Sequence, residues 1–212
     1  KSKLVEAISD FKFLSVRNNE TQKFVADLTS ENALVVADPT LLFNFDKLIC
    51  TVDKKERYIL TYIIGKEISC GHDKVLELIN RKYKNIRVKS IIIPSMNFDI
   101  YNWTNELCVD IDPIQWVELV SNADFFYTDS YHGVLFALKY HIDFLAYFTE
   151  NNRSSRFKDL IKRYKINNNI VDDTGSYDLE YVFSKSLDFS EIDKNINDHI
   201  KTSINFLKNS LD

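Results

Sequence analysis

Short apolar segments alternate with longer amphipathic segments along most of the chain, and this alternation constrains the fold more than any other feature. Six apolar runs rich in Val, Ile, Phe and Tyr predict buried strands, at residues 11–16, 33–37, 58–64, 88–93, 125–128 and 144–148. Helical spacing of apolar residues lies between them, at 20–28, 74–83, 113–122, 133–140 and 155–164. Strands that alternate with helices form parallel sheets covered on both faces, so the sequence predicts an α/β, Rossmann-like fold.

These units are distributed unevenly along the chain. Residues 57–170 hold enough of them for a complete C-terminal Rossmann-like domain. Residues 1–56 hold only two strands and two helices, too few to close such a domain, so we expect an N-terminal domain that is only partly present. Residues 171–212 end in a helix whose apolar positions form one stripe: Ile192, Ile196, Ile200, Ile204 and Leu207. The stripe needs a surface to cover, and we expect this segment to pack back on the N-terminal part.

Composition excludes several classes of function. Apolar residues make up 45% of the chain and charged residues 27%, as is usual for a globular protein. The net charge is −4, and no basic stripe could follow a nucleic-acid backbone. The 3 cysteines are too widely spaced for a disulfide framework or a zinc site, which suits a reducing compartment. No apolar run approaches the length of a membrane span, so we expect a cytoplasmic protein without nucleic-acid partners.

The segment Asp129-Ser130-Tyr131-His132-Gly133 is the strongest candidate site. It follows a buried strand and opens a helix, which is where open α/β sheets bind ligands and where the helix dipole favours an anion. Gly133 would allow a ligand close to the backbone, and His132 could transfer a proton near neutral pH. A purely structural interpretation, in which Ser130 caps the helix and His132 packs nearby, has equal weight.

A second candidate lies at residues 151–157, Asn-Asn-Arg-Ser-Ser-Arg-Phe, again between a strand and a helix. Either Ser154 or Ser155 would cap that helix. Arg153 and Arg156 are positively charged, whereas the dipole at a helix N-terminus favours negative charge. Their presence there favours an anionic ligand that guanidinium groups can bind. The alternative is an ordinary surface pair of arginines.

Two residues of the first fifty stand at strand ends as well. Arg17 follows the first strand, where a surface salt bridge is favoured over a role in ligand binding. Asp38 follows the second strand, where capping the next turn is favoured over catalysis. No set of His, Cys, Asp and Glu has metal-ligand spacing, and His72, His141 and His199 have no obvious site around them.

Taken in order, these segments resemble the polysaccharide pyruvyl transferase family. The matching fragments are short but ordered: Ser15-Val16-Arg17, Asp38-Pro39-Thr40-Leu41-Leu42, Trp116, Ala123-Asp124, Thr128 to Gly133, Phe136-Ala137-Leu138, and Ser154-Ser155-Arg156-Phe157. The resemblance covers about residues 11–166. It implies a GT-B-like architecture, with a substrate cleft between two Rossmann-like domains.

The resemblance also implies roles for individual residues. His132 corresponds to an active-site histidine, and Arg17 to a ligand of the donor substrate. A later basic residue, often Lys in the family, contributes in some members; here Arg153 and Arg156 are the nearest, and the choice between them stays open. Ser130 and Gly133 belong to the donor-binding helix opening.

The implied reaction moves pyruvate from phosphoenolpyruvate onto sugar hydroxyls as a ketal, in bacterial cell-surface or exopolysaccharide synthesis. The acceptor would be a sugar or polysaccharide, free or lipid-linked, and neither a cofactor nor a metal is required. Two alternatives remain. One is a GT-B nucleotide-sugar glycosyltransferase, although no carboxylate suited to a ribose stands out; the other is a non-catalytic binding relative.

Overall fold

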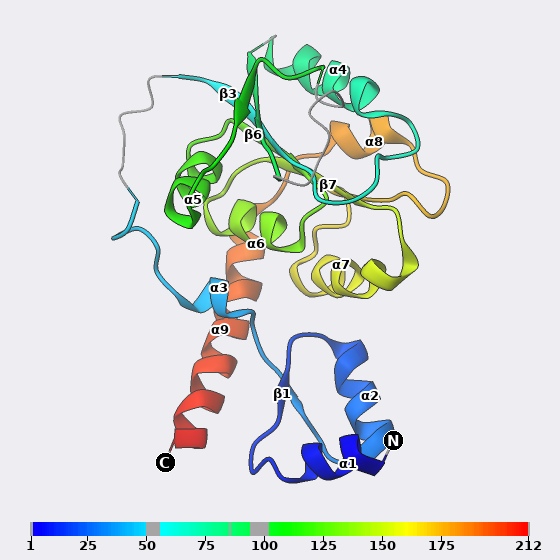
Figure 1. Ribbon diagram of the computed structural model, residues 1–212, viewed down its shortest axis with the longest axis vertical. Coiled ribbons are helices and arrows are strands. Elements are labelled where there is room, and N and C mark those ends of the chain that lie inside the picture. Colours follow the sequence, from blue (N-terminus) through cyan, green and yellow to red (C-terminus); the bar gives the residue numbers. More distant parts are fainter. Residues whose placement is uncertain (1, 50–55, 85, 94–101, 212) are drawn as a thin grey trace.

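A six-stranded parallel sheet dominates the computed structural model, which describes residues 2–49, 56–84, 86–93 and 102–211 (Figure 1). Its strands lie in the order β5-β4-β3-β6-β7-β8, and every neighbouring pair is parallel. Their bounds are Tyr58–Tyr62 (β3), Arg87–Ile91 (β4), Glu106–Cys108 (β5), Phe125–Thr128 (β6), Phe144–Phe148 (β7) and Ile170–Asp172 (β8). The predicted α/β class with a parallel sheet is confirmed. Because the strand order reverses between β3 and β6, the switch point where such sheets bind ligands lies at their carboxyl ends.

The central strands are almost entirely buried and mostly apolar because both faces of the sheet are covered. On β7, Phe144, Ala146 and Phe148 enter one core, whereas Leu145 and Tyr147 enter the other. Helices α5 (Pro113–Ser121), α6 (Tyr131–Lys139) and α7 (Asn151–Tyr164) supply the first core, and α4 (His72–Tyr83) and α8 (Leu179–Ser184) supply the second. The sequence analysis missed β5, β8 and α8, since three to six residues are too few to show a period.

Residues 2–49 form a small second sheet with three helices, and Ala37 and Leu41 join this part to the core beneath the large sheet. This part contains α1 (Ser2–Ser9), β1 (Ser15–Val16), α2 (Asn19–Thr29), β2 (Leu34–Val35) and α3 (Pro39–Leu42), with β1 and β2 paired in parallel. The strand predicted from residue 11 is wrong over its first part: Phe11 is 65% exposed, and the ladder begins only at Ser15. Helix α1 was not predicted.

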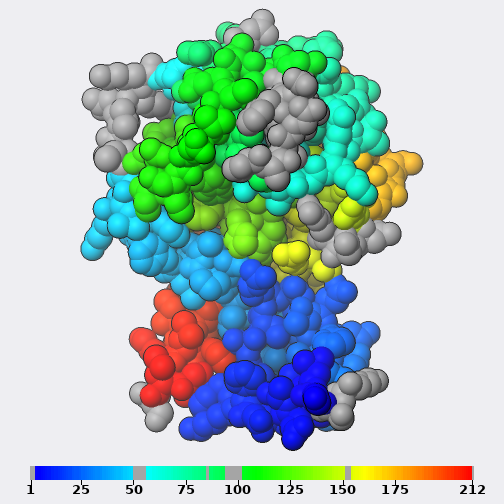
Figure 2. Space-filling model, in the orientation of Figure 1, coloured from blue at the N-terminus to red at the C-terminus, as the bar shows by residue number. Residues whose placement is uncertain are grey.

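The long final helix, α9 (Phe189–Leu211), contacts both parts of the molecule. Ile192 and Ile196 belong to the core beneath the large sheet. Farther along, Ser203 accepts a hydrogen bond from the Ala37 N–H (2.7 Å), and Phe206 meets Phe13 edge-on with ring centroids 6.4 Å apart. Figure 2 shows the red end of the chain and the blue first residues side by side at one end of the molecule.

Two details of the predicted organisation differ from the structure. The boundary expected at residue 170 falls inside β8, which pairs with β7 and belongs to the large sheet. The apolar stripe of α9 is also not covered along its whole length, because Ile204 is 38% and Leu207 48% exposed.

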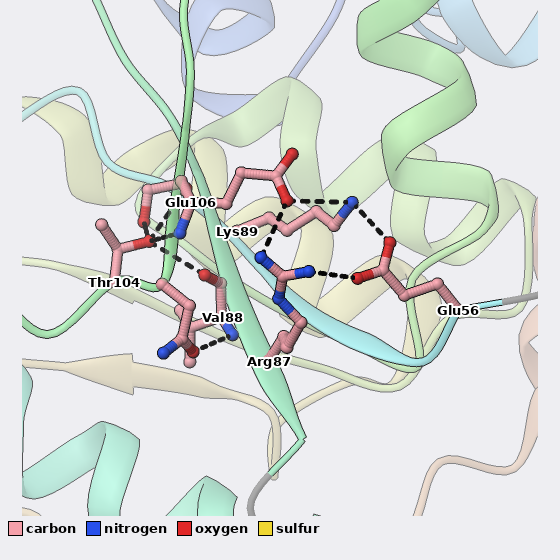
Figure 3. Close-up of polar contacts among 8 residues, drawn as sticks. Glu56, Arg87, Val88, Lys89, Thr104 and Glu106 are labelled. Carbon is pink, nitrogen blue, oxygen red and sulfur yellow. Dashed lines mark hydrogen bonds and ion pairs between the residues drawn. The ribbon is translucent and has the colours of Figure 1, made fainter.

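A charged network joins the amino-terminal ends of β3, β4 and β5 (Figure 3). Glu56 binds Arg87 (3.1 Å) and Lys89 (2.9 Å), and Glu106 lies 3.6 and 3.3 Å from the same two cations. Exposed pairs of this kind are screened by solvent and contribute little individually. This end of the sheet is therefore tied together by salt bridges, while the opposite, carboxyl end holds the candidate site.

Candidate functional site

The candidate site begins where β6 passes into α6, at the switch point of the sheet. Thr128, the last residue of β6, donates its hydroxyl hydrogen to the Tyr62 carbonyl of β3 (2.6 Å) and accepts from the Ser130 N–H (3.0 Å). The Ser130 hydroxyl then accepts from the Gly133 N–H (3.2 Å), which makes it the N-cap of α6. Next to it, the Asp129 carboxylate accepts from the Ile64 N–H (2.7 Å). These bonds fix the helix opening to both central strands.

The reason for glycine at position 133 differs from the expected one. A Cβ there would lie 2.9 Å from the Thr128 hydroxyl oxygen and 3.1 Å from a ring carbon of Phe126. The missing side chain thus lets α6 pack closely on β6, and it faces the protein interior. The expectation that Gly133 gives a ligand access to the backbone is wrong.

Asp38 links the first fifty residues to His132. Its carboxylate accepts from Arg17 (Nη1 to Oδ2, 2.8 Å) and from the Thr40 N–H (3.1 Å), and His132 Nε2 lies 3.7 Å from the same Oδ2. The Asp38 side chain is only 3% exposed, whereas those of Arg17 and His132 are 45% and 50% exposed. A buried carboxylate therefore lies behind two accessible side chains that can meet a ligand.

The ionised form of Asp38 is strongly stabilised. Burial by itself would raise the pKa of this carboxyl. Contact with His132, the Thr40 backbone N–H and the Arg17 guanidinium outweighs burial and holds the pKa of Asp38 well below its usual range. Asp38 is thus a fixed negative charge that lies beside Arg17 and His132 and can orient both side chains.

Tyr131 stands between two arginines that come from opposite ends of the chain. The guanidinium carbons of Arg17 and Arg156 lie 5.9 and 6.0 Å from the centre of its ring. Burial raises the pKa of Tyr131 to about 12, so its phenol is neutral at physiological pH. Two arginines lie beside this ring and only Arg17 is paired with the Asp38 carboxylate, so these groups together carry net positive charge and suit an anion.

Helix α7 supplies Arg156 and connects to the other arginine through Asn19. Asn19, near Arg17, donates to Asp159 of α7 (2.7 Å). A cavity of about 160 Å³ lies beside Arg156 and is also lined by Ser130, Tyr131 and His132. Arg17, His132 and Arg156 are thus brought together by three different strand-to-helix connections.

Other residues of the second candidate segment are placed differently from expectation. Helix α7 begins at Asn151 with Glu150 in the N-cap position, so neither Ser154 nor Ser155 caps it. Arg153 lies in the first turn of α7, but its side chain falls outside the described residues.

The sequence analysis missed two members of the cluster. It assigned Asp38 only the capping role, which the bond to Thr40 does show, and it gave Tyr131 no role. The position of Asp38 was the available signal, since it follows the strand that pairs in parallel with the one before Arg17. Carboxyl ends of paired parallel strands lie side by side.

Two histidines that looked unremarkable in the sequence are buried away from this cluster. His72 Nδ1 lies 2.9 Å from the Tyr127 hydroxyl, and His199 Nδ1 lies 2.9 Å from that of Tyr164.

Within the described ranges, no three His, Cys, Asp or Glu side chains are grouped so that they could hold a metal ion. The same part of the chain contains no helix that is both long and apolar enough to cross a bilayer.

Comparison with known proteins gives a family and several remote structural matches. The family model for polysaccharide pyruvyl transferase matches residues 1–152, which include Arg17, Asp38 and His132 and end in the first turn of α7. No curated protein matches the sequence.

Among solved structures, the UDP-GlcNAc 2-epimerase of Methanocaldococcus jannaschii, in complex with UDP-GlcNAc and UDP, is 12% identical with a TM-score of 0.49. The match covers 87% of this chain and 54% of that one. The UDP-GlcNAc 2-epimerase of Neisseria meningitidis bound to UDP-GlcNAc is 10% identical, with a TM-score of 0.46 and coverage of 91% and 55%. The chain spans about half the length of these two structures.

Proposed function

Because the chain belongs to the polysaccharide pyruvyl transferase family, we propose that it binds phosphoenolpyruvate at the opening of α6 and transfers the pyruvyl group to sugar hydroxyls as a ketal. The observation that carries this proposal is the meeting of Arg17, His132 and Arg156 around Tyr131 and the buried Asp38. The acceptor would be a sugar or polysaccharide, free or lipid-linked, in cytoplasmic steps of bacterial cell-surface or exopolysaccharide synthesis. The reaction needs no cofactor or metal.

The donor is a small molecule with a carboxylate and a phosphate, and the site offers a partner for each kind of oxygen. Guanidinium groups bind carboxylate and phosphate in a bidentate manner. Arg17 has five N–H donors, so it can hold Asp38 through Nη1 and an anion as well. The Gly133 N–H at the start of α6 is already bonded to the Ser130 hydroxyl, but the N-terminal end of α6 remains the positive end of the helix dipole, which favours an anion.

The reaction forms two C–O bonds at C2 of phosphoenolpyruvate. One sugar hydroxyl oxygen adds to C2 while its proton, or one exchanged for it, goes to C3, so that the methylene becomes a methyl group. The second hydroxyl oxygen then displaces phosphate from C2, and its proton leaves with the phosphate. Atoms balance without water, because one diol and one phosphoenolpyruvate give one ketal and one phosphate.

His132 suits one of these proton transfers. Its ring is half exposed and lines the 160 Å³ cavity beside Arg156, which we call the donor cavity. Nε2 lies near the Asp38 carboxylate, which would stabilise the imidazolium after the histidine takes up a hydroxyl proton. The arginines would stabilise the charge that develops on the departing phosphate.

Calorimetric titration with phosphoenolpyruvate tests the donor site. A charge-assisted hydrogen bond contributes about 1.5–3 kcal/mol, so Arg156→Ala and Arg17→Ala should each weaken binding roughly tenfold to a hundredfold. Arg81→Ala is the matched control, because Arg81 is exposed and pairs with Glu77 on α4. Wild-type affinity in both site variants, or tight binding of UDP-sugars in place of phosphoenolpyruvate, would rule the proposal out.

A transfer assay that follows phosphate release tests His132. His132→Ala should abolish transfer while it leaves the melting temperature unchanged, because the ring is half exposed. His141→Ala is a close control, since His141 is 52% exposed and also lies beside a carboxylate, that of Asp193. Near-normal turnover of His132→Ala, or its unfolding, would show that the histidine is structural.

A further inference from the structure

A second and larger cavity lies on the other side of His132. Its volume is about 420 Å³, and its wall is mostly aromatic and aliphatic, with Phe45, Tyr62, Trp116 and Phe136 among the lining side chains. Ser130 and His132 line it as well. The same two residues line the 160 Å³ cavity beside Arg156, so His132 stands at the boundary between the two cavities.

The two cavities differ in the ligand that each can take. The smaller one contains Arg156 and the opening of α6, which suit a compact anion, while the Asp129 carboxylate that also lines it accepts a hydrogen bond from the Ile64 N–H. No basic side chain lines the larger one apart from His132, and transferring a trianion onto an apolar wall is unfavourable. A ligand of the larger cavity must instead have apolar surface together with a few polar groups.

We infer that the larger cavity is the acceptor site, in which a pyranose lies with its apolar C–H face against Trp116 and its hydroxyls toward His132. This inference rests on the proposed function. An acceptor hydroxyl must reach C2 of the donor, so acceptor and donor have to bind in adjoining cavities on either side of the proton-transfer residue. The cavities around Lys82 and Phe183 share no residue with the donor cavity and cannot meet this requirement.

Trp116 is held in a fixed position, as a binding platform requires. Its ring makes T-shaped contacts with the rings of Tyr62 (centroids 5.5 Å apart), Phe136 (5.1 Å) and Phe126 (6.4 Å). It lies in the first turns of α5, whose start is fixed by a capping box between Asp112 and Gln115. The face of an aromatic ring is electron-rich and attracts the weakly positive C–H groups of a sugar.

The chain has only 2 tryptophans, and this allows a direct test by fluorescence. Trp103 packs against His72, on the other face of the sheet from Trp116. Trp103→Phe therefore leaves Trp116 as the only indole reporter, and Trp116→Phe leaves only Trp103. Methyl glycosides of glucose, galactose, mannose and N-acetylglucosamine are titrated into both variants, with and without phosphoenolpyruvate.

At least one glycoside should change the emission of the Trp103→Phe variant in a saturable way and leave that of Trp116→Phe unchanged. By calorimetry, Trp116→Ala should bind the same glycoside about tenfold more weakly and phosphoenolpyruvate with wild-type affinity. If Trp116→Ala does not fold, the milder Trp116→Phe should still lose affinity for the glycoside only.

The inference is overturned if no glycoside changes Trp116 emission, if both tryptophans respond alike, or if UDP changes the emission and the glycosides do not. Failure of the proposed function has a different signature, since the wild-type chain would then bind no phosphoenolpyruvate, whatever the tryptophans report.

Discussion

A single hydroxyl on α9 anchors the chain next to Asp38. Ser203 accepts from the Ala37 N–H (2.7 Å) and donates to the His199 carbonyl (2.7 Å). Ala37 is 2% and Ser203 1% exposed, so Ser203→Ala leaves a buried N–H without its acceptor. An unsatisfied buried donor costs about 1–3 kcal/mol. A chain of this length loses roughly 2–4 °C of melting temperature per kcal/mol, so we expect Ser203→Ala to melt about 2–12 °C lower.

Thr202→Ala provides the control for this measurement. Thr202 also donates its hydroxyl hydrogen to the carbonyl four residues earlier, that of Asp198 (3.0 Å), but it is exposed and lies on the outer side of α9. Both variants lose a hydrogen bond from a hydroxyl to the carbonyl four residues earlier, and both gain about 0.5 kcal/mol of helix propensity. The difference between their melting temperatures therefore isolates the bond to Ala37. Equal melting temperatures by calorimetry or circular dichroism would refute the reasoning.

Three further outcomes follow from packing and charge. Gly133→Ala should lower the melting temperature, since overpacking against Thr128 costs about 1–3 kcal/mol and exceeds the helix gain of about 1 kcal/mol. Burial lowers the pKa of His72, so as the pH falls the unfolded chain takes up a proton at a higher pH than the folded chain does. The free energy of unfolding should therefore decrease as the pH drops below about 6.5. His72→Asn should reduce this pH dependence in melting curves recorded from pH 7.5 to 5. The pKa of Asp38 is lowered on folding, so its stabilisation is complete above about pH 4 and is lost as the pH falls further. Asp38→Asn should remove that part of the acid transition in unfolding followed by circular dichroism.

Local periodicity and motif placement in the sequence determined the fold class and one edge of the site. Runs such as 125–128 and 144–148 are dominated by aromatic and aliphatic residues without a polar alternation, which indicates a sheet covered on both faces, and the structure has that sheet. The position of His132 directly after a buried strand placed it at the carboxyl end of the sheet. The capped start of α5 at Asp112 was equally local, because the Asp-Pro pair acts on its own turn.

Tertiary structure alone decided which of these groups meet. Arg17 and Arg156 lie beside the same ring, and near them α2 and α7 are joined by a hydrogen bond between Asn19 and Asp159, residues far apart in the sequence. Asp38 looks like an ordinary helix cap until β1 and β2 pair and bring it to Arg17 and His132.

Contacts between segments also bury residues that the sequence places at the surface. Ser203 and His199 lie on α9, whose sequence is largely polar. They are buried because α9 packs against other parts of the chain, where Ser203 bonds to Ala37 and His199 to Tyr164. Gly133 carries a packing constraint that no neighbouring residue reveals, since the atoms it would strike belong to β6. A sequence shows the period of each segment directly, whereas contacts between segments depend on how the segments are brought together in space, and a single chain does not display that information.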